Sequence, residues 1–310
     1  MARVDYKAYG KINLTLCVTG EANGYHTLDT VVLTVSKYNK IILKSRRDDK
    51  ILITFGGKYG VTPKKQADTN AYKAAKAFID KFKTKGVNIE LIENIPSGGG
   101  MGGSSADIAG VLNGLKKLYH IDGDVKDMAD SLGSDSGYLL TGGAARLFSR
   151  GEKVKKIDSK LSGYVLVIYA KSGGVTSKDC FCKFDELKCE GVVCDNDEIE
   201  KILSVGDISA LRGKTGNALY NAACELNPEI AENLSALKSL SPTLCGMTGS
   251  GSTVFCMFDT YELTAWALWK LKRKFYGRIE ILEIIDPSKK SWFKSIKSPY
   301  SPITEEELKN

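Results

Sequence analysis

Five glycines in the eleven residues 95–105 constrain this chain more than any other feature of its sequence. Residues 87–93, just before them, alternate apolar and polar side chains, which is typical of a strand with one solvent-exposed face. After them, apolar residues recur at spacings of three and four, at Ile108, Val111, Leu112, Leu115 and Leu118. We therefore expect a strand, a glycine loop and an amphipathic helix that act as one unit.

Such a loop can bind phosphate, because backbone amides without a Cβ in the way can close on phosphate oxygens. The helix that follows adds unpaired N–H groups and the positive end of its dipole. The candidate phosphate-binding residues are Pro96, Gly98, Gly99, Gly100, Met101, Gly102, Gly103, Ser104 and Ser105. A flexible surface loop is the alternative, but it does not explain why the glycines directly precede a strongly amphipathic helix.

Two other phosphate-binding patterns fit less well. Gly98, Gly100 and Gly103 formally satisfy the dinucleotide fingerprint, but that fold needs a strand buried on both faces. Gly213-Lys214-Thr215 resembles the end of a P-loop, yet Ile208 stands where its first glycine is required. The spacing therefore favours neither a dinucleotide-binding fold nor a P-loop.

A length of 310 residues fits two domains of about 150 residues each. A strand pattern restarts at Tyr164–Ala170, so we predict domains at 1–160 and 161–285 and a polar, loosely ordered tail at 286–310. We also predict strands at Val4–Val18 and Thr27–Leu43, a tight loop at Ser134–Gly137 and a helix at Gly216–Leu226. The sequence shows no internal repeat.

Charge and cysteine content point away from several classes of protein. The net charge of +7 comes from lysines scattered along the chain, so we expect no nucleic-acid partner. No apolar run approaches the roughly 20 residues of a membrane helix, and the first residues lack a secretory signal. We expect a cytoplasmic protein without a membrane partner. The eight cysteines lack paired C-x-x-C knuckles, which favours reduced thiols over a zinc site at Cys180–Cys194.

Three segments, in this order, resemble the motifs of the GHMP kinase superfamily. They are Ala8-Tyr9-Gly10-Lys11-Ile12-Asn13-Leu14, the loop from Pro96 to Ser105, and Thr248-Gly249-Ser250-Gly251-Ser252-Thr253-Val254-Phe255. The resemblance spans the chain to about residue 285. It implies an α+β, two-domain GHMP kinase fold with an active-site cleft between the domains. It also implies an enzyme that uses ATP and Mg²⁺ to phosphorylate an alcohol.

The resemblance assigns roles to residues outside the glycine loop. Gly133-Ser134-Asp135-Ser136-Gly137 corresponds to a family segment whose aspartate is the catalytic base, although the family's proline is replaced here by Gly137. Asp135 is then the expected base, Lys11 its catalytic partner and Asn13 a substrate contact. Without the resemblance, a lone Asp in a turn is more often a cap, and a Lys–Asp pair can be a structural salt bridge.

Within the superfamily, Asn23-Gly24-Tyr25-His26-Thr27-Leu28 is similar to a segment of the diphosphocytidyl methylerythritol kinases. In those enzymes the tyrosine and histidine help to recognise cytosine, and Phe181 stands where an aromatic residue sandwiches the base. The implied partner is a small molecule, methylerythritol linked to cytidine diphosphate. His120 is interpreted as a structural or surface residue.

Departures from the family pattern leave alternatives open. Two glycines rather than three precede the Ser104-Ser105 pair, and Gly137 alters the region after Asp135. The alternatives are a GHMP kinase for homoserine, mevalonate or a sugar, a catalytically silent nucleotide-binding relative, and, with less support, a dehydrogenase. The sequence does not indicate the oligomeric state or the Mg²⁺ ligands.

Overall fold

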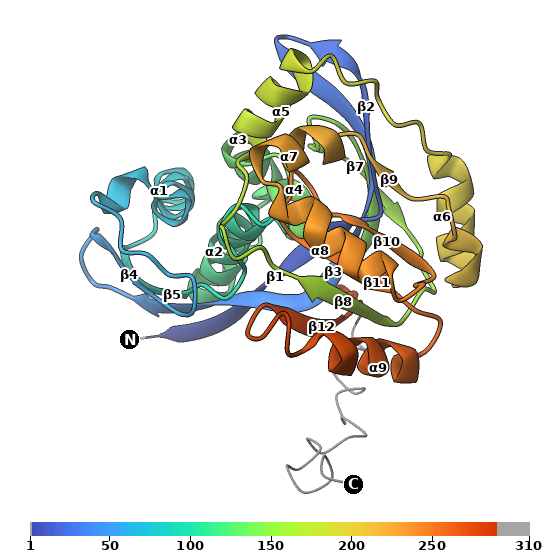
Figure 1. Cartoon of the computed structure of the whole chain (residues 1–310). Helices are drawn as coiled ribbons and strands as arrows, with labels where there is room; N and C mark the ends of the chain where they lie inside the picture. Colours follow the sequence, from blue (N-terminus) through green and yellow to red (C-terminus); the bar gives the residue numbers. More distant parts are fainter. Residues whose placement is uncertain (1, 290–310) are drawn as a thin grey trace, which may run out of the picture.

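A computed structural model describes residues 2–289, so most of the predicted tail, residues 290–310, lies outside the described residues. Within the described range the strands form one eight-stranded and one four-stranded sheet (Figure 1). The larger sheet is built around the long strand β3 (Tyr25–Ser45), which pairs with β1, β2, β5 and β6. The smaller sheet has the order β10-β11-β8-β12 and is antiparallel throughout.

The strands of the larger sheet come mainly from the first half of the chain. They are β1 (Arg3–Asn13), β2 (Thr15–Ala22), β3, β4 (Ile51–Gly56), β5 (Val87–Ile92), β6 (Ala144–Ser149), β7 (Lys153–Ile157) and β9 (Gly216–Asn217). The smaller sheet contains β8 (Tyr164–Ile168), β10 (Leu244–Met247), β11 (Val254–Met257) and β12 (Ile279–Glu283). The division between the sheets follows the predicted boundary except at β9, which pairs in parallel with β2.

Helices α1 and α2 pack together beside the larger sheet (Figure 1). The first half contains α1 (Asn70–Phe82), α2 (Gly103–Tyr119), α3 (Lys126–Leu132) and α4 (Ser136–Leu139). The second half contains α5 (Ser177–Glu186), α6 (Asn196–Val205), α7 (Tyr220–Leu226), α8 (Glu229–Lys238) and α9 (Tyr261–Leu271). Thr69 caps α1, because its side-chain oxygen accepts from the Tyr72 amide.

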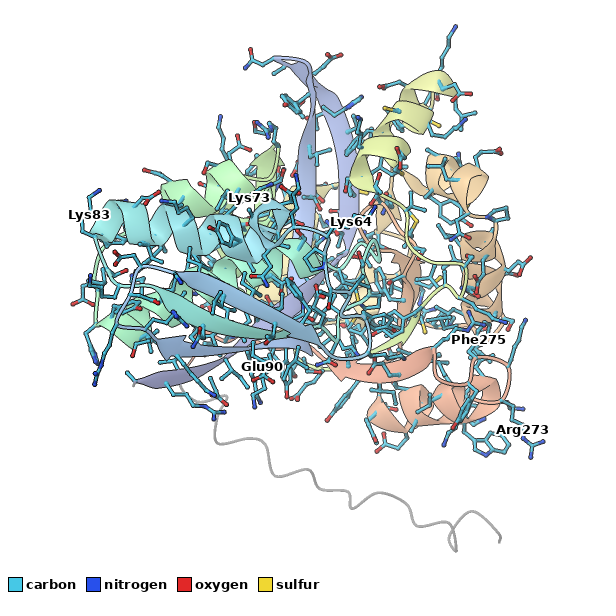
Figure 2. All side chains as sticks on the ribbon, turned by 90° about the vertical axis from the view of Figure 1, so that its left-hand side faces the viewer. Lys64, Lys73, Lys83, Glu90, Arg273 and Phe275 are labelled. Carbon is cyan, nitrogen blue, oxygen red and sulfur yellow. The ribbon has the colours of Figure 1, made fainter. Side chains whose placement is uncertain are left out.

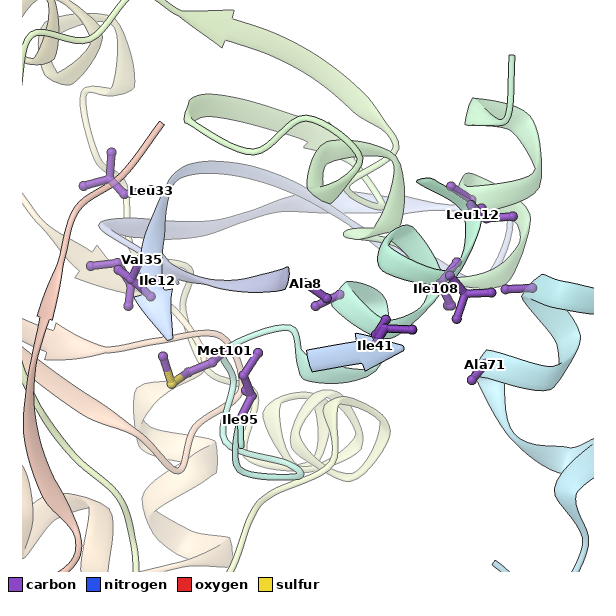
Figure 3. Close-up of a cluster of buried hydrophobic side chains, with 14 of the residues drawn as sticks. Ala8, Ile12, Leu33, Val35, Ile41, Ala71, Ile95, Met101, Ile108 and Leu112 are labelled. Atoms are coloured by element: carbon purple, nitrogen blue, oxygen red, sulfur yellow. The ribbon is translucent and has the colours of Figure 1, made fainter. Parts of the chain in front are cut away.

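The predicted unit of strand, glycine loop and helix is present as β5, residues 93–102 and α2. Side chains of β5 alternate between buried and partly exposed, and β5 pairs antiparallel with β3 and parallel with β4. A dinucleotide-binding strand would lie in a parallel sheet and be buried on both faces, so the mixed pairing and the half-exposed face of β5 do not fit a dinucleotide-binding fold. Figure 3 shows Ile95 and Met101 directed into the hydrophobic core near Ile12 and Val35, which anchors both ends of the loop.

Two local predictions were wrong. Ser136 begins the one-turn helix α4, so Ser134–Gly137 is not entirely a loop. Gly216 and Asn217 form strand β9, and the helix predicted from Gly216 begins only at Tyr220. In the second case a tertiary contact with β2 decides the conformation, because residues 216–217 find backbone partners at the edge of the larger sheet.

The labelled basic residues lie on both halves of the molecule. In Figure 2, Lys64, Lys73 and Lys83 lie near α1, whereas Arg273 lies at the opposite end of the molecule. None of the helices in the described part of the chain combines the length and apolar character needed to cross a bilayer.

Candidate active site

A cavity of about 700 Å³ lies where the three sequence motifs meet. Its wall contains Lys11 of β1, the whole loop from Pro96 to Ser105, and Ser134 and Asp135 before α4. The second half of the chain adds residues 174–177 at the start of α5, and Gly249 and Ser250 between β10 and β11. Two helix N-termini, those of α2 and α5, therefore border the cavity, an arrangement that favours an anion.

The glycine loop requires glycine on conformational and steric grounds. Gly98, Gly100 and Gly102 have φ values of 65°, 73° and 72°, the left-handed region that residues with a Cβ rarely adopt. A Cβ on Gly100 would also overlap the carbonyl oxygen of Thr248, and one on Gly249 would lie 2.7 Å from the carbonyl oxygen of Gly100. The loop and the third motif are thus packed backbone against backbone.

The carbonyl oxygens of the loop are held by the rest of the protein. Gly98 O accepts from the amides of Val175 at 3.0 Å and Ser252 at 3.2 Å, and Gly99 O accepts from the Thr253 amide at 3.3 Å. Gly100 O accepts from the Thr248 hydroxyl at 3.0 Å, and Met101 O from the Lys11 amide at 3.0 Å. The amides of residues 100–103, by contrast, donate to no acceptor among the described residues. The loop therefore has free donors for an anionic ligand.

Lys11 and Asp135 face each other at the cavity wall, with Nζ and Oδ2 3.5 Å apart. The Lys11 side chain is almost buried, at 5% exposed, whereas Asp135 is 27% exposed and open to a ligand. Lys11 lies along Gly102, because a Cβ there would stand 3.4 Å from its Cε. The structure thus brings together Asp135, Lys11 and the glycine loop, which the sequence predicted to share one site.

Asn13 does not line this cavity. Its Oδ1 accepts from Lys11 Nζ at 2.6 Å and from the Gly249 amide at 3.0 Å, and its Nδ2 donates to the Thr30 hydroxyl at 2.8 Å. Its side chain therefore fixes Lys11 and joins the first motif to the third. The predicted contact between Asn13 and substrate stays a prediction.

A second cavity of about 270 Å³ adjoins the first and was not predicted. Ser97, Gly103 and Ser104 line both cavities. The lining of the second includes Phe55, Tyr59, Val61 and Pro63 together with the polar residues Asn39, Asn70 and Asp107. Asn70 Nδ2 donates to the Ser104 hydroxyl. Apolar walls with a few polar groups suit an aromatic ring system.

Comparison with known proteins resolves the family. The model of the GHMP kinases N terminal domain matches residues 69–145, which include the glycine loop and Asp135. A Bacillus cereus (strain B4264) protein named 4-diphosphocytidyl-2-C-methyl-D-erythritol kinase is 32% identical over 255 residues, which is 80% of this chain and 86% of the relative. The chain belongs to the 4-diphosphocytidyl-2-C-methyl-D-erythritol kinase family.

Solved structures agree with this membership. A crystal structure of 4-(cytidine 5'-diphospho)-2C-methyl-D-erythritol kinase superposes with a TM-score of 0.75 at 25% identity and covers 91% of this chain and 99% of that one. Homoserine kinase from Cytophaga hutchinsonii gives a TM-score of 0.68 at 16% identity, covering 92% of this chain and 95% of its own, which shows the shared fold alone. The predicted GHMP kinase fold is confirmed.

In this member of the 4-diphosphocytidyl-2-C-methyl-D-erythritol kinase family, the predicted base-recognition residues lie outside both cavities. The His26 and Phe181 rings stack with centroids 4.8 Å apart and planes 16° apart, and His26 Nε2 lies 2.8 Å from Asp185 Oδ1. Tyr25 is 54% exposed, and the Arg150 guanidinium lies 4.1 Å from its ring centroid. Phe181 thus stacks on His26, while Tyr25 is partly exposed and packs against Arg150.

The glycine that replaces the proline of the 4-diphosphocytidyl-2-C-methyl-D-erythritol kinase family has a structural reason here. A Cβ at Gly137 would collide with Oδ1 of Asp130, whose other oxygen is paired with Lys126. Asp130 therefore occupies the space that a side chain at residue 137 would need. Ser136, between Asp135 and Gly137, is fully buried and its hydroxyl lacks a partner among the described residues.

The P-loop-like segment and the cysteines, which the sequence did not favour as sites, line neither cavity. Lys214 of the P-loop-like segment pairs with Glu198 and does not line either cavity. All eight cysteines are free thiols, and no cluster suited to a metal ion occurs among the residues that the structure describes.

Proposed function

We propose that this chain transfers the γ-phosphate of ATP to the 2-hydroxyl of 4-diphosphocytidyl-2-C-methyl-D-erythritol, a step of the non-mevalonate route to terpenoid precursors. The observation that carries this proposal is the pair Lys11 and Asp135, 3.5 Å apart at the wall of the cavity that holds the glycine loop. The family relationship supplies the substrate.

The two adjoining cavities support a mode of ATP binding. The triphosphate would lie in the larger cavity, against the free amides of residues 100–103 and the N-terminus of α2. The nucleoside would extend past Ser97, Gly103 and Ser104 into the smaller cavity, whose apolar walls suit a purine. In this proposal the phosphates and the base occupy opposite ends of one continuous site, joined at the shared wall.

Phosphoryl transfer asks the protein mainly for positioning and charge neutralisation. Asp135 would accept the proton of the substrate hydroxyl, since its carboxylate is accessible from the cavity. Lys11, held by Asn13, would orient Asp135 and neutralise charge on the transferred group. Mg²⁺ would come bound to the ATP phosphates, because Asp135 is the one carboxylate in the wall of the described cavity.

Substrate recognition would use the aromatic residues of the β2–β3 hairpin and α5. We infer that the cytosine base stacks against the His26 and Phe181 pair or against Tyr25. A base cannot lie between His26 and Phe181 as they stand, because their centroids are 4.8 Å apart. Either the pair separates when substrate binds, or the base uses an outer face.

An ADP-release assay tests the proposal. The purified protein is supplied with Mg²⁺, ATP and, in parallel, 4-diphosphocytidyl-2-C-methyl-D-erythritol, homoserine, mevalonate and galactose. We expect turnover with the first alcohol and at least about 10²-fold lower kcat/KM with the others, since their recognition groups differ wholly. Preferred turnover of another alcohol would redirect the assignment within the superfamily, and no turnover with any of them would indicate a silent relative.

A further inference from the structure

Asp107 is a buried carboxyl group to which the proposed reaction gives no role. It lies in the second turn of α2 and lines the smaller cavity, and only 6% of the residue is exposed. No cation pairs with it among residues 2–289. Asn39 Nδ2 donates to its Oδ1 at 2.8 Å. An isolated carboxylate is unfavourable in such a place, so the neutral acid is the preferred form.

Burial and the charge of Glu93 oppose the ionisation of Asp107, whereas the hydrogen bond from Asn39 favours it. Glu93 and Tyr59 are the other titratable side chains in the wall of the smaller cavity. Burial and the negative charge of Glu93 outweigh the bond from Asn39, and together they raise the pKa of Asp107 to about 8. At neutral pH the side chain is therefore a carboxylic acid with one O–H donor.

The neighbouring asparagine decides which oxygen carries the proton. Asn39 Oδ1 accepts from the amides of Asn94 at 2.7 Å and Ile95 at 2.9 Å, so its amide is held in one orientation. Its Nδ2 then donates to Asp107 Oδ1, which must act as an acceptor. The proton belongs on Oδ2, and this O–H is the group of Asp107 that remains available to a ligand.

We propose that Asp107, in its protonated form, donates a hydrogen bond to the nucleoside of ATP in the smaller cavity. The inference rests on the proposed function, because it needs the nucleoside to lie in this cavity. A nucleoside offers ring nitrogens and ribose oxygens as acceptors. Ionised Asp107 has no proton to donate and presents a negative charge to those lone pairs, so nucleoside binding weakens when the acid ionises.

The substitution Asp107→Asn tests the proposal, because an amide keeps the shape, one donor and one acceptor but does not ionise. Dissociation constants for adenosine and for ATP are measured by calorimetry from pH 7 to pH 9. We expect the variant to bind both within about threefold of wild type at pH 7. At pH 9 only about a tenth of a group with this pKa is protonated, so wild type should bind about tenfold more weakly than the variant. Because the ionisation of ATP affects both proteins equally, it cancels in the ratio of the wild-type and variant dissociation constants at each pH.

Glu93→Gln is the matched control, since Glu93 is the other carboxyl group in the same wall. The charge of Glu93 helps to raise the pKa of Asp107, so this variant should keep the loss of affinity with rising pH but show it at lower pH, and its titration therefore begins at pH 5. The inference is wrong if Asp107→Asn follows the wild-type curve, if Glu93→Gln abolishes the pH dependence, or if ATP shows the effect and adenosine does not. An effect seen with ATP alone would mean that ionised Asp107 repels the phosphates, not that it loses a hydrogen bond to the nucleoside.

Two further outcomes of the binding measurements can be distinguished. If Asp107→Asn does not fold, the affinity of the wild-type protein for adenosine still tests the inference, because adenosine has no group that titrates between pH 7 and 9. An affinity for adenosine that does not change over this range overturns the inference. If wild type fails to bind ATP at pH 7, the proposed function itself is refuted. ATP binding without a pH dependence refutes only the role of Asp107.

Discussion

At the scale of single residues, exposure to the cavity distinguishes Asp135 from Lys11 and Asn13, which are buried behind it. Asp135 is open to the cavity while Lys11 is buried behind it, so the acid can meet a substrate hydroxyl and the lysine stays fixed. Asn13 is buried further back, and its bonds to Lys11 and Gly249 make it a support for the lysine. A residue quoted in a motif can therefore have a structural role in addition to any contact with ligand.

Replacing Asp135 by Asn should leave ATP affinity within about threefold and lower kcat by at least about 10²-fold, the scale of losing a general base. The amide keeps the shape of the side chain but cannot accept the proton of the hydroxyl. Steady-state kinetics and calorimetry measure the two quantities. Asp127→Asn, an exposed change on α3, is the control. Unchanged turnover in Asp135→Asn would exclude it as the base.

Replacing Gly100 by Ala should destabilise the protein by more than the roughly 1–2 kcal/mol that a left-handed φ costs a residue with a Cβ. The φ of 73° supplies that strain, and the overlap with Thr248 O adds to it. Gly277→Ala is matched, because Gly277 has a φ of 72° and no atom within 4 Å of its virtual Cβ. Denaturant unfolding of both variants gives the comparison. Equal losses would show that the loop yields easily to the added methyl group.

At the scale of elements, the local sequence pattern predicted a helix or strand correctly where the residues that determine it lie within or next to that element. The spacing of Ile108 to Leu118 and the glycines before them predicted α2 and its loop. Pattern failed where a distant partner decides the structure: β9 exists because residues 216–217 meet the edge of β2. The smaller cavity could not be predicted either, because β4, the loop after it and α2 come together only in the folded chain.

The segment that leads into α5 depends on Glu229 at the start of α8. Its carboxylate accepts from the amides of Lys171 and Ser172 at 2.8–2.9 Å and from the Ser172 hydroxyl, and it pairs with Arg278. Although partial burial opposes the shift, these bonds lower the pKa of Glu229 to about 2. The carboxylate therefore holds the chain that continues into the cavity wall at Gly174.

A depressed pKa contributes stability above the ordinary value, and this contribution is lost as the pH falls from about 4.5 through about 2. Glu229→Gln should therefore be less stable than wild type at pH 6, and the difference should narrow steadily below pH 4.5. Urea unfolding at a series of pH values measures it. The exposed Glu232→Gln on the same helix should show little difference at any pH. A difference in unfolding free energy between Glu229→Gln and wild type that does not change with pH would exclude a contribution from the ionisation of Glu229.

At the scale of the whole molecule, the two predicted domains are closely interdependent. Strand β9 completes the edge of the larger sheet, and Val165, Val167 and Leu244 belong to the same hydrophobic cluster as Ile12 and Leu33. The boundary near residue 160 agrees with the division between the sheets, but the division into domains stays a prediction.

A fragment of residues 1–160 should not fold on its own, because it would expose this shared apolar surface and the unpaired edge of β2. Circular dichroism and size-exclusion chromatography of the isolated fragment measure this. We expect aggregation or loss of tertiary structure, and co-expression with residues 161–310 should restore soluble protein. A monomeric fragment with cooperative unfolding would show that the first domain is autonomous.

The carbonyl oxygens of Gly98 to Gly100 are held by residues 175, 248, 252 and 253, all of which follow the boundary. The conformation of the glycine loop is thus encoded in both parts of the gene. Recombination with a related kinase at residue 160 would give the loop foreign neighbours, so a chimaera of two family members should need compensating substitutions on both sides of that junction.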